Sequence, residues 1–280
     1  MDFSQLRGEL RQKFDEICLE FDSAPPPQLL HYTSPAGFRG FVKSGTIWCT
    51  DIRHVNDPRE GDHGFEVLKV VLQRKSVPKE FLGAVHSSQD LFGLKRLYTS
   101  YVASFSSGSE EAYMWTDYAA KGTGCAIVFD YSALDEGAEE GRKYAVVRIL
   151  YDSAAQLCKM RQIVDHAIQV QRRYSLSSHD AAQFWKIEVA YSLLNCGMLF
   201  KETKWDIERE FRLVVMGGDD VKPFSVEGRP RVALQFDRGA IVGVVRGPNA
   251  GSRLQAERIR TLLQQCGYAE GLPIRDAVSG

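Results

Sequence analysis

Apolar residues recur every three or four positions near the start of the chain, and this spacing predicts an amphipathic helix over residues 3–21. The apolar positions are Phe3, Leu6, Leu10, Phe14, Ile17, Cys18 and Phe21. Three consecutive prolines at positions 25 to 27 follow and end the helix. We therefore predict an N-terminal helix and linker over residues 1–27, followed by one domain over residues 28–280.

From residue 28 onward, short apolar runs bounded by turn residues are interspersed with segments of helical spacing. The apolar runs predict strands at 29–32, 46–50, 101–106, 125–130, 144–152, 207–216, 222–226, 231–236, 241–246 and 272–275. Helical spacing predicts helices at 34–43, 65–74, 80–97, 110–120, 154–173, 180–200 and 253–266. Because strands and helices do not alternate regularly, we predict an α+β fold with a mixed sheet, flanking helices and a helical insertion over residues 153–200.

Composition narrows the possible classes of protein. The chain has 280 residues, of which 44% are hydrophobic and 25% charged, and its formal net charge is -1. This balance gives no overall attraction to nucleic acid or anionic membranes. The apolar runs are too short to cross a membrane, and the charged start does not resemble a signal peptide. We expect a cytoplasmic folding compartment, which also fits a protein that a dedicated system secretes into a host or target cell.

Metal and thiol chemistry have weak support in the sequence. The six cysteines are scattered without a C-x-x-C pair, as expected for free thiols in a reducing compartment. His54, Asp57, Asp62 and His63 are potential metal ligands, but their spacing matches no common metal motif, and a polar loop explains them more simply. We predict no metal. A cysteine or histidine nucleophile remains an open alternative, since its partners would meet only in the fold.

Two glutamates stand two residues apart, at 208 and 210, at the start of the strand expected over 207–216. Side chains alternate faces along a strand, so Glu208, Glu210 and Arg212 are expected to share one face. An isolated E-x-E pattern of this kind is usually a solvated strand face, with the arginine partly neutralising the acids. Its interpretation therefore depends on the other motifs of the chain.

Those motifs form an ordered set that resembles a widespread bacterial family of formerly unknown function, assigned to the ADP-ribosyltransferase superfamily. The matching residues are His31-Tyr32-Thr33, Asn56-Asp57-Pro58-x-Glu60, Ser104-Phe105-Ser106, Met114-Trp115-x-x-Tyr118, Gly124, Trp205-x-x-Glu208-x-Glu210-x-Arg212 and Gly247-Pro248. The resemblance covers roughly residues 28 to 276. It implies a split β-sheet that holds NAD in a cleft, with NAD as a co-substrate.

The resemblance also implies roles for individual residues. His31 would bond the adenosine ribose, and Thr33 or its backbone the nicotinamide amide. Ser104 and Ser106 would support the ribose or the catalytic glutamate, while Phe105 packs inward. Further contacts with NAD or the acceptor are implied for Tyr32, Asn56, Trp115 and Tyr118. For each of these residues a structural role is the simpler alternative: a satisfied strand histidine, core packing of the rings, or a turn at Asn56.

The catalytic carboxylate implied by the resemblance is Glu210, with Glu208 orienting or deprotonating the nucleophile. In arginine-modifying members of the superfamily the second glutamate of such a pair is catalytic, but here the leading motif is of the histidine type. That difference leaves open both the acceptor and which of the two carboxylates is essential.

The expected function is therefore an NAD-dependent ADP-ribosyltransferase, of the kind found among bacterial toxins, effectors and defence proteins. Its acceptor would be a macromolecule, a protein more readily than a nucleic acid. An NAD glycohydrolase and a non-catalytic nucleotide- or protein-binding module are the alternatives. Target recognition is expected in the insertion, which carries Trp185, Tyr191 and a basic cluster. That cluster comprises Lys159, Arg161, Arg172 and Arg173.

Overall fold

The computed structural model describes residues 4–19, 24–55, 62–73, 77, 79, 82–83, 100–108, 110–134, 144–174, 179–180, 198–216 and 221–278. Three expectations from the sequence lie wholly or mostly outside these residues. They are the loop that begins at Asn56, the helix at 80–97, and the second helix of the insertion, which carries Trp185 and Tyr191.

The elements agree closely with the sequence pattern. The helices are α1 (Ser4–Leu19), α2 (Pro35–Ser44), α3 (His63–Gln73), α5 (Ala112–Tyr118), α7 (Ser153–Arg173) and α9 (Ala256–Gln265). The strands are β1 (Gln28–Thr33), β2 (Thr46–Asp51), β3 (Ser100–Ser106), β4 (Cys125–Asp130), β5 (Tyr144–Arg148), β6 (Glu210–Met216), β7 (Phe224–Val226), β8 (Arg229–Gln235), β9 (Ile241–Arg246) and β10 (Ile274–Asp276). Short 3-10 turns are η1 (Ile52–His54), η2 (Thr203–Glu208), η3 (Arg238–Ala240) and η4 (Gly251–Leu254).

The ten strands form one mixed sheet, which confirms the predicted α+β class. Its main path runs β10-β9-β4-β1-β3-β2-β8-β7, and β6 joins it through β3 and carries β5 on its other edge. Strands β9 and β10 are parallel, whereas β1 is antiparallel to both β3 and β4.

The sheet divides at one edge of β3. Strand β6 pairs with the other edge over all seven residues of β3. On the divided edge, β2 pairs with Tyr101 and Val102, whereas β1 pairs with Ser106. Among the described strands, none lies beside the stretch from Ala103 to Phe105 on this edge, and a gap opens between β1 and β2.

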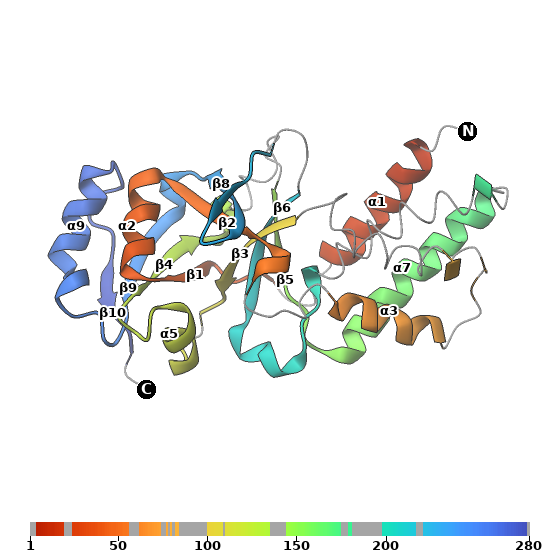
Figure 1. The fold of residues 1–280 in the computed structure, drawn as a ribbon, viewed down its shortest axis with the longest axis horizontal. Coiled ribbons are helices and arrows are strands. Elements are labelled where there is room, and N and C mark those ends of the chain that lie inside the picture. Colours follow the sequence, from red (N-terminus) through yellow and green to blue (C-terminus); the bar gives the residue numbers. More distant parts are fainter. Residues whose placement is uncertain are drawn as a thin grey trace.

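Helices cover the two faces of the sheet unequally (Figure 1). Helices α2 and α9 pack on one face, where Phe38, Ile259 and Leu263 join a core with Phe105 and Phe129. On the opposite face, the short helix α5 packs over β1, β4 and β9. Beyond the split, the cavity of the candidate site lies beside β2 and β3.

A second core lies at the other end of the molecule, where α1, α3 and α7 pack together (Figure 1). Helix α7 confirms the first helix predicted in the insertion. Two residues of the basic cluster contact α1, because Lys159 donates to the carbonyl of Ile17 and Arg173 pairs with Glu9. These two cations therefore contribute to holding the N-terminal helix.

No helix in the described part of the chain is both long and apolar enough to cross a membrane. Among the cysteines described, Cys49 and Cys125 are buried free thiols, Cys158 is an exposed one and Cys266 is half-buried. Burial raises the pKa of Cys49, the first of these thiols, to about 12, so it stays protonated at neutral pH.

Candidate functional site

A cavity of about 250 Å³ lies over the divided edge of β3. It brings together most of the residues that the sequence analysis selected. Those that line it are His31, Tyr32, Ser104, Phe105, Ser106, Tyr118, Glu208 and Glu210. These residues come from β1, β3, α5, η2 and β6, so the fold gathers side chains that are up to 179 positions apart in the sequence.

The two glutamates do not share a strand, which corrects the expectation from their spacing. Strand β6 begins at Glu210, and Glu208 ends the 3-10 turn η2. Between them Arg209 adopts a left-handed conformation with φ of 43°. This turn breaks the alternation of side chains, and Ile207 before it is exposed. Both carboxylates nevertheless enter the same cavity and are almost fully buried.

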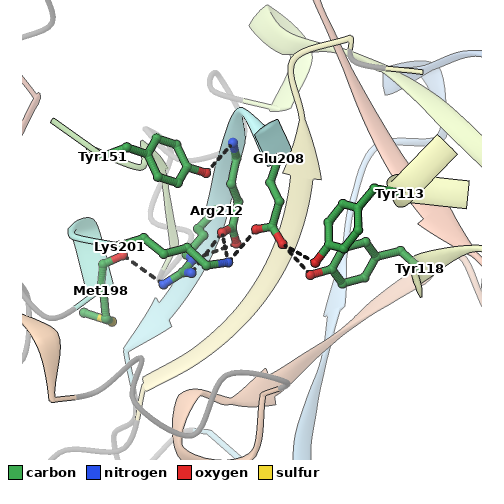
Figure 2. Close-up of polar contacts among 8 residues, drawn as sticks. Tyr113, Tyr118, Tyr151, Met198, Lys201, Glu208 and Arg212 are labelled. Carbon is green, nitrogen blue, oxygen red and sulfur yellow. Dashed lines mark hydrogen bonds and ion pairs between the residues drawn. The ribbon is translucent and has the colours of Figure 1, made fainter. Parts of the chain in front are cut away.

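Glu210 is held by several donors, and Figure 2 labels Arg212, Lys201 and Tyr151 among its partners. Arg212 donates to both carboxylate oxygens, from Nε at 2.7 Å and from Nη2 at 2.9 Å. Lys201 donates from Nζ at 3.0 Å, and the Ser104 hydroxyl also bonds this carboxylate. The backbone N–H of Glu210 donates to the hydroxyl of Tyr151. The position of this carboxylate is thus fixed from several directions.

Glu208 faces the tyrosines of α5 (Figure 2). Its Oε1 accepts from the hydroxyl of Tyr118 at 2.5 Å and of Tyr113 at 3.3 Å, while Oε2 accepts from Lys201 at 2.5 Å. Lys201 therefore bridges the two carboxylates. Burial and the adjacent carboxylate Glu208 raise the pKa of Tyr118, so this tyrosine remains a donor at neutral pH.

The charges in this cluster balance. Burial lowers the pKa of Lys201, but Glu210 and Glu208 outweigh it and raise the pKa overall, so the lysine is charged. Burial, together with Glu208, raises the pKa of Glu210 above its usual value, although Lys201 and the Ser104 hydroxyl favour its ionised form. Because Arg212 also donates to both oxygens, we take Glu210 as ionised. Two carboxylates then face two cations.

His31 bridges the gap in the sheet. Its Nδ1 lies 3.0 Å from the backbone carbonyl of Ser104 and must donate there, because a carbonyl only accepts. The ring packs beside Phe105 and Phe41, at centroid distances of 5.5 and 6.2 Å. Burial lowers the pKa of His31, although the bond to Ser104 opposes this. The neutral ring therefore carries its proton on Nδ1 and leaves Nε2 as an acceptor.

This lowered pKa predicts a dependence of stability on pH. Protonation of His31 favours the unfolded chain. The stabilisation of the folded protein by neutral His31 is therefore complete above about pH 6.5, the usual pKa of an unfolded histidine, and is lost as pH falls. Between roughly pH 6.5 and 5, we expect the free energy of unfolding to fall more steeply with falling pH in the unchanged protein than in His31→Gln. The two slopes should differ by up to about 1 kcal/mol per pH unit. Denaturant titrations at several pH values measure both slopes, and equal slopes would contradict the prediction.

Other residues selected from the sequence lie away from the cavity lining. Trp115 is 3% exposed and packs edge-on against Tyr32, at a centroid distance of 4.9 Å. Its position agrees with the alternative of core packing. The backbone of Thr33 packs against Gly124, where an added Cβ would lie 2.0 Å from the Thr33 carbonyl oxygen. Gly124 is thus required for the close approach of its segment to the end of β1.

Two buried polar atoms in residues that line the cavity have no hydrogen-bond partner within the described residues. They are the hydroxyl of Ser106 and the indole Nε1 of Trp205. Buried polar groups without partners are uncommon in folded proteins, and a bound ligand is one source of the missing bond. A ligand with several hydroxyl groups, such as a nucleotide ribose, fits these atoms and the free acceptor of His31.

Sequence reasoning missed several residues of the cluster. Lys201, Tyr113 and Tyr151 contact Glu208 or Glu210, but none lies in a recognisable motif. Lys201 reaches the site because it follows the bridge between Leu150 and Phe200 at the edge of the sheet. The only sequence signal was a lysine seven residues before Glu208, which local spacing cannot distinguish from a solvated one.

The described residues contain no group of three or more His, Cys, Asp or Glu that could hold a metal ion. Of the potential ligands named above, His54 lies 3.8 Å from Asp51 and His63 bonds Gln156. Asp57 lies outside the described residues.

Comparison with known families finds a similarity over a segment that carries part of this site. A family model described as "Protein of unknown function (DUF2971)" matches residues 114–213. The matched segment begins within α5, includes β4, β5 and all of α7, and ends in β6 after both glutamates. Comparison with curated proteins and with solved structures gives no match.

Proposed function

We propose that this protein cleaves the nicotinamide glycosidic bond of NAD and transfers ADP-ribose to a macromolecular acceptor. The observation that carries the proposal is the carboxylate of Glu210, buried at the floor of a cavity and fixed by Arg212, Lys201 and Ser104. A preorganised charge of this kind is what a reaction with a cationic transition state requires.

The chemistry assigns different tasks to the two carboxylates. As the bond from the anomeric carbon to nicotinamide breaks, both electrons leave with nicotinamide and positive charge develops on the ribose. Glu210 would accept a hydrogen bond from a ribose hydroxyl and stabilise that charge, as carboxylates do in glycosidases. The nucleophile then bonds to the anomeric carbon, and its proton passes to Glu208.

Other residues of the cavity would bind and orient NAD. The Nε2 of neutral His31 is an acceptor for a ribose hydroxyl, and the hydroxyl of Ser106 is an unused donor or acceptor. Tyr118 and Tyr113 hold Glu208 toward the cavity. A cavity of about 250 Å³ admits only part of a dinucleotide, so the remainder of NAD would extend to its rim.

A binding module without catalysis is the second candidate, and the charge balance of the cluster favours it. Lys201 and Arg212 neutralise both carboxylates, and a cation next to Glu210 opposes the build-up of positive charge on a substrate. Catalysis therefore requires that the ribose contacts Glu210 more closely than it contacts either cation. Turnover of NAD by the purified protein separates the two candidates.

The first experiment measures nicotinamide release from NAD with and without a cell extract as the source of acceptors. NAD labelled in the adenylate half reports transfer, and treatment of the product with protease or nuclease identifies the class of acceptor. Release that depends on the protein supports glycosidic cleavage. Release without labelling of any macromolecule identifies a glycohydrolase instead. Binding of NAD without release identifies a binding module.

Replacement of Glu208 by glutamine tests its assignment. We expect labelling of the acceptor to fall by about 10² to 10⁴-fold, with a smaller fall in nicotinamide release, because a general base acts on the nucleophile. The fold should survive, since Lys201 keeps its pairing with Glu210 and the tyrosines can still donate to the amide oxygen. Tyr113→Phe, which removes only the 3.3 Å bond, is the matched control. An equal loss of both rates would instead place Glu208 in bond cleavage.

A further inference from the structure

An exposed aromatic ring lies at the rim of the cavity. Trp48 on β2 is 45% exposed and is one of three large hydrophobic side chains exposed among the described residues. Arg231 lies over its ring, with the guanidinium carbon 5.5 Å from the centroid, and Phe224 packs edge-on at 5.3 Å. The ring is therefore held in place while nearly half of its surface stays open, and Trp48 also lines the cavity.

Two arginines flank this ring, and neither has an acidic partner in the part of the chain that the structure describes. The register of β2, β7 and β8 places Trp48, Phe224, Arg229 and Arg231 on one face of the sheet. Arg229 is exposed and lines the cavity. Within the described residues neither Arg229 nor Arg231 has a salt-bridge partner, and the Nε of Arg231 is buried without a hydrogen bond. The two guanidinium groups are thus available to an anion.

The spacing of these side chains suits a polyanion with aromatic rings. Residues two apart on a strand lie roughly 7 Å apart on the same face, so Arg229 and Arg231 can contact successive charges along one chain. A ring that stacks on Trp48 would lie beside them. We call the surface formed by Trp48, Phe224, Arg229 and Arg231 the arginine ledge. It leads through Thr50 and Val102 to Ser104 and the carboxylate cluster.

We propose that the arginine ledge binds single-stranded nucleic acid, with a base stacked on Trp48 and phosphates paired with Arg229 and Arg231. Aromatic stacking combined with a positively charged track is the general mode of single-strand binding. The overall charge of -1 does not oppose this, because the positive charge is local and neither arginine forms a salt bridge among the described residues. Nucleic acid, rather than protein, then becomes the favoured acceptor. That last step rests on the proposed function, whereas the binding itself does not.

The test measures the fluorescence anisotropy of labelled dT12 and U12 oligonucleotides with the full chain, in the absence of NAD. We expect Trp48→Ala to weaken binding by about tenfold and Trp48→Phe, which keeps a stacking ring, to restore most of it. With two phosphate contacts, the logarithm of the affinity should fall with the logarithm of salt concentration with a slope of about -1.4. Arg229→Ala should reduce that slope by about 0.7.

Arg260→Ala, on the exposed face of α9, is the matched control and should leave binding unchanged. Three results would overturn the proposal: no binding of either oligonucleotide, equal weakening by Trp48→Ala and Arg260→Ala, or a duplex bound as tightly as a single strand. Weaker binding of NAD to Trp48→Ala, with oligonucleotide binding unchanged, would assign the ledge to the adenylate of NAD and also overturn it. Nicotinamide release is measured separately, so failure of this proposal and failure of the proposed function are distinguishable.

Discussion

Replacement of Glu210 by aspartate or by glutamine is expected to lower the rate of nicotinamide release by about a hundredfold to a thousandfold. Glutamine removes the charge that stabilises the developing cation. Aspartate keeps the charge but withdraws it by one methylene, and a displacement of about 1 Å is enough for a hundredfold loss. Steady-state assays of both variants against the unchanged protein measure the effect.

The aspartate variant also controls for stability. Glutamine leaves Arg212 and Lys201 with less negative charge, so part of its effect would come from the fold. Aspartate preserves the counter-ion, and its melting temperature should stay closer to that of the unchanged protein. If both variants released nicotinamide at the original rate, Glu210 would have only a structural role and the assignment would pass to Glu208.

Replacement of Arg212 by methionine is expected to lower the free energy of unfolding by about 3–5 kcal/mol. Its guanidinium is 1% exposed, donates to both oxygens of Glu210, and bonds the carbonyl of Met198 at 3.1 Å. Methionine fills a similar space, but it leaves the buried negative charge of Glu210 without the guanidinium that partly neutralises it. Denaturation in urea, followed by fluorescence and circular dichroism, measures the change.

The matched control for this variant is Arg260→Met, which breaks an exposed pair with Glu257 on α9. We expect the free energy of unfolding of this variant to fall by less than about 1 kcal/mol, because exposed ion pairs contribute little to stability. Combining Arg212→Met with Glu210→Gln should recover part of the loss, since the buried charge is then removed on both sides. A cost for Arg212→Met as small as that of Arg260→Met would show that this buried pair does not determine stability.

Most element positions could be predicted because local chemistry determines them. Helix α2 is an example: Ser34 caps its first turn, Pro35 starts it, and Gly45 ends it in a left-handed conformation with φ of 64°. The strands were recognisable for a similar reason, since buried runs such as β4, which follows the turn at Gly122 to Gly124, stand out from their neighbours. These signals lie within a few residues of the element that they define.

The site was less predictable because its geometry depends on distant contacts. Nothing local indicates that Arg209 takes a left-handed conformation, and this single residue separates Glu208 from the strand that begins at Glu210. Likewise, Lys201 reaches the carboxylates only through the pairing of Leu150 with Phe200. The sequence motifs identified which side chains meet, but their hydrogen-bond partners follow from tertiary structure.

The divided edge of β3 lies between two walls of the cavity, and each wall belongs to a different pair of strands. Ser104 and Glu210 belong to one ladder of seven paired residues, so their distance is hard to change. His31 belongs to the ladder of β1 and β4, which meets β3 at Leu30 and Ser106 and through its own bond to Ser104. A small rotation about this junction would widen or narrow the cavity while Ser104 and Glu210 keep their distance, and it would move the tyrosines of α5 relative to Glu208. Ligands of different thickness can therefore be accommodated by one wall while the other keeps its shape.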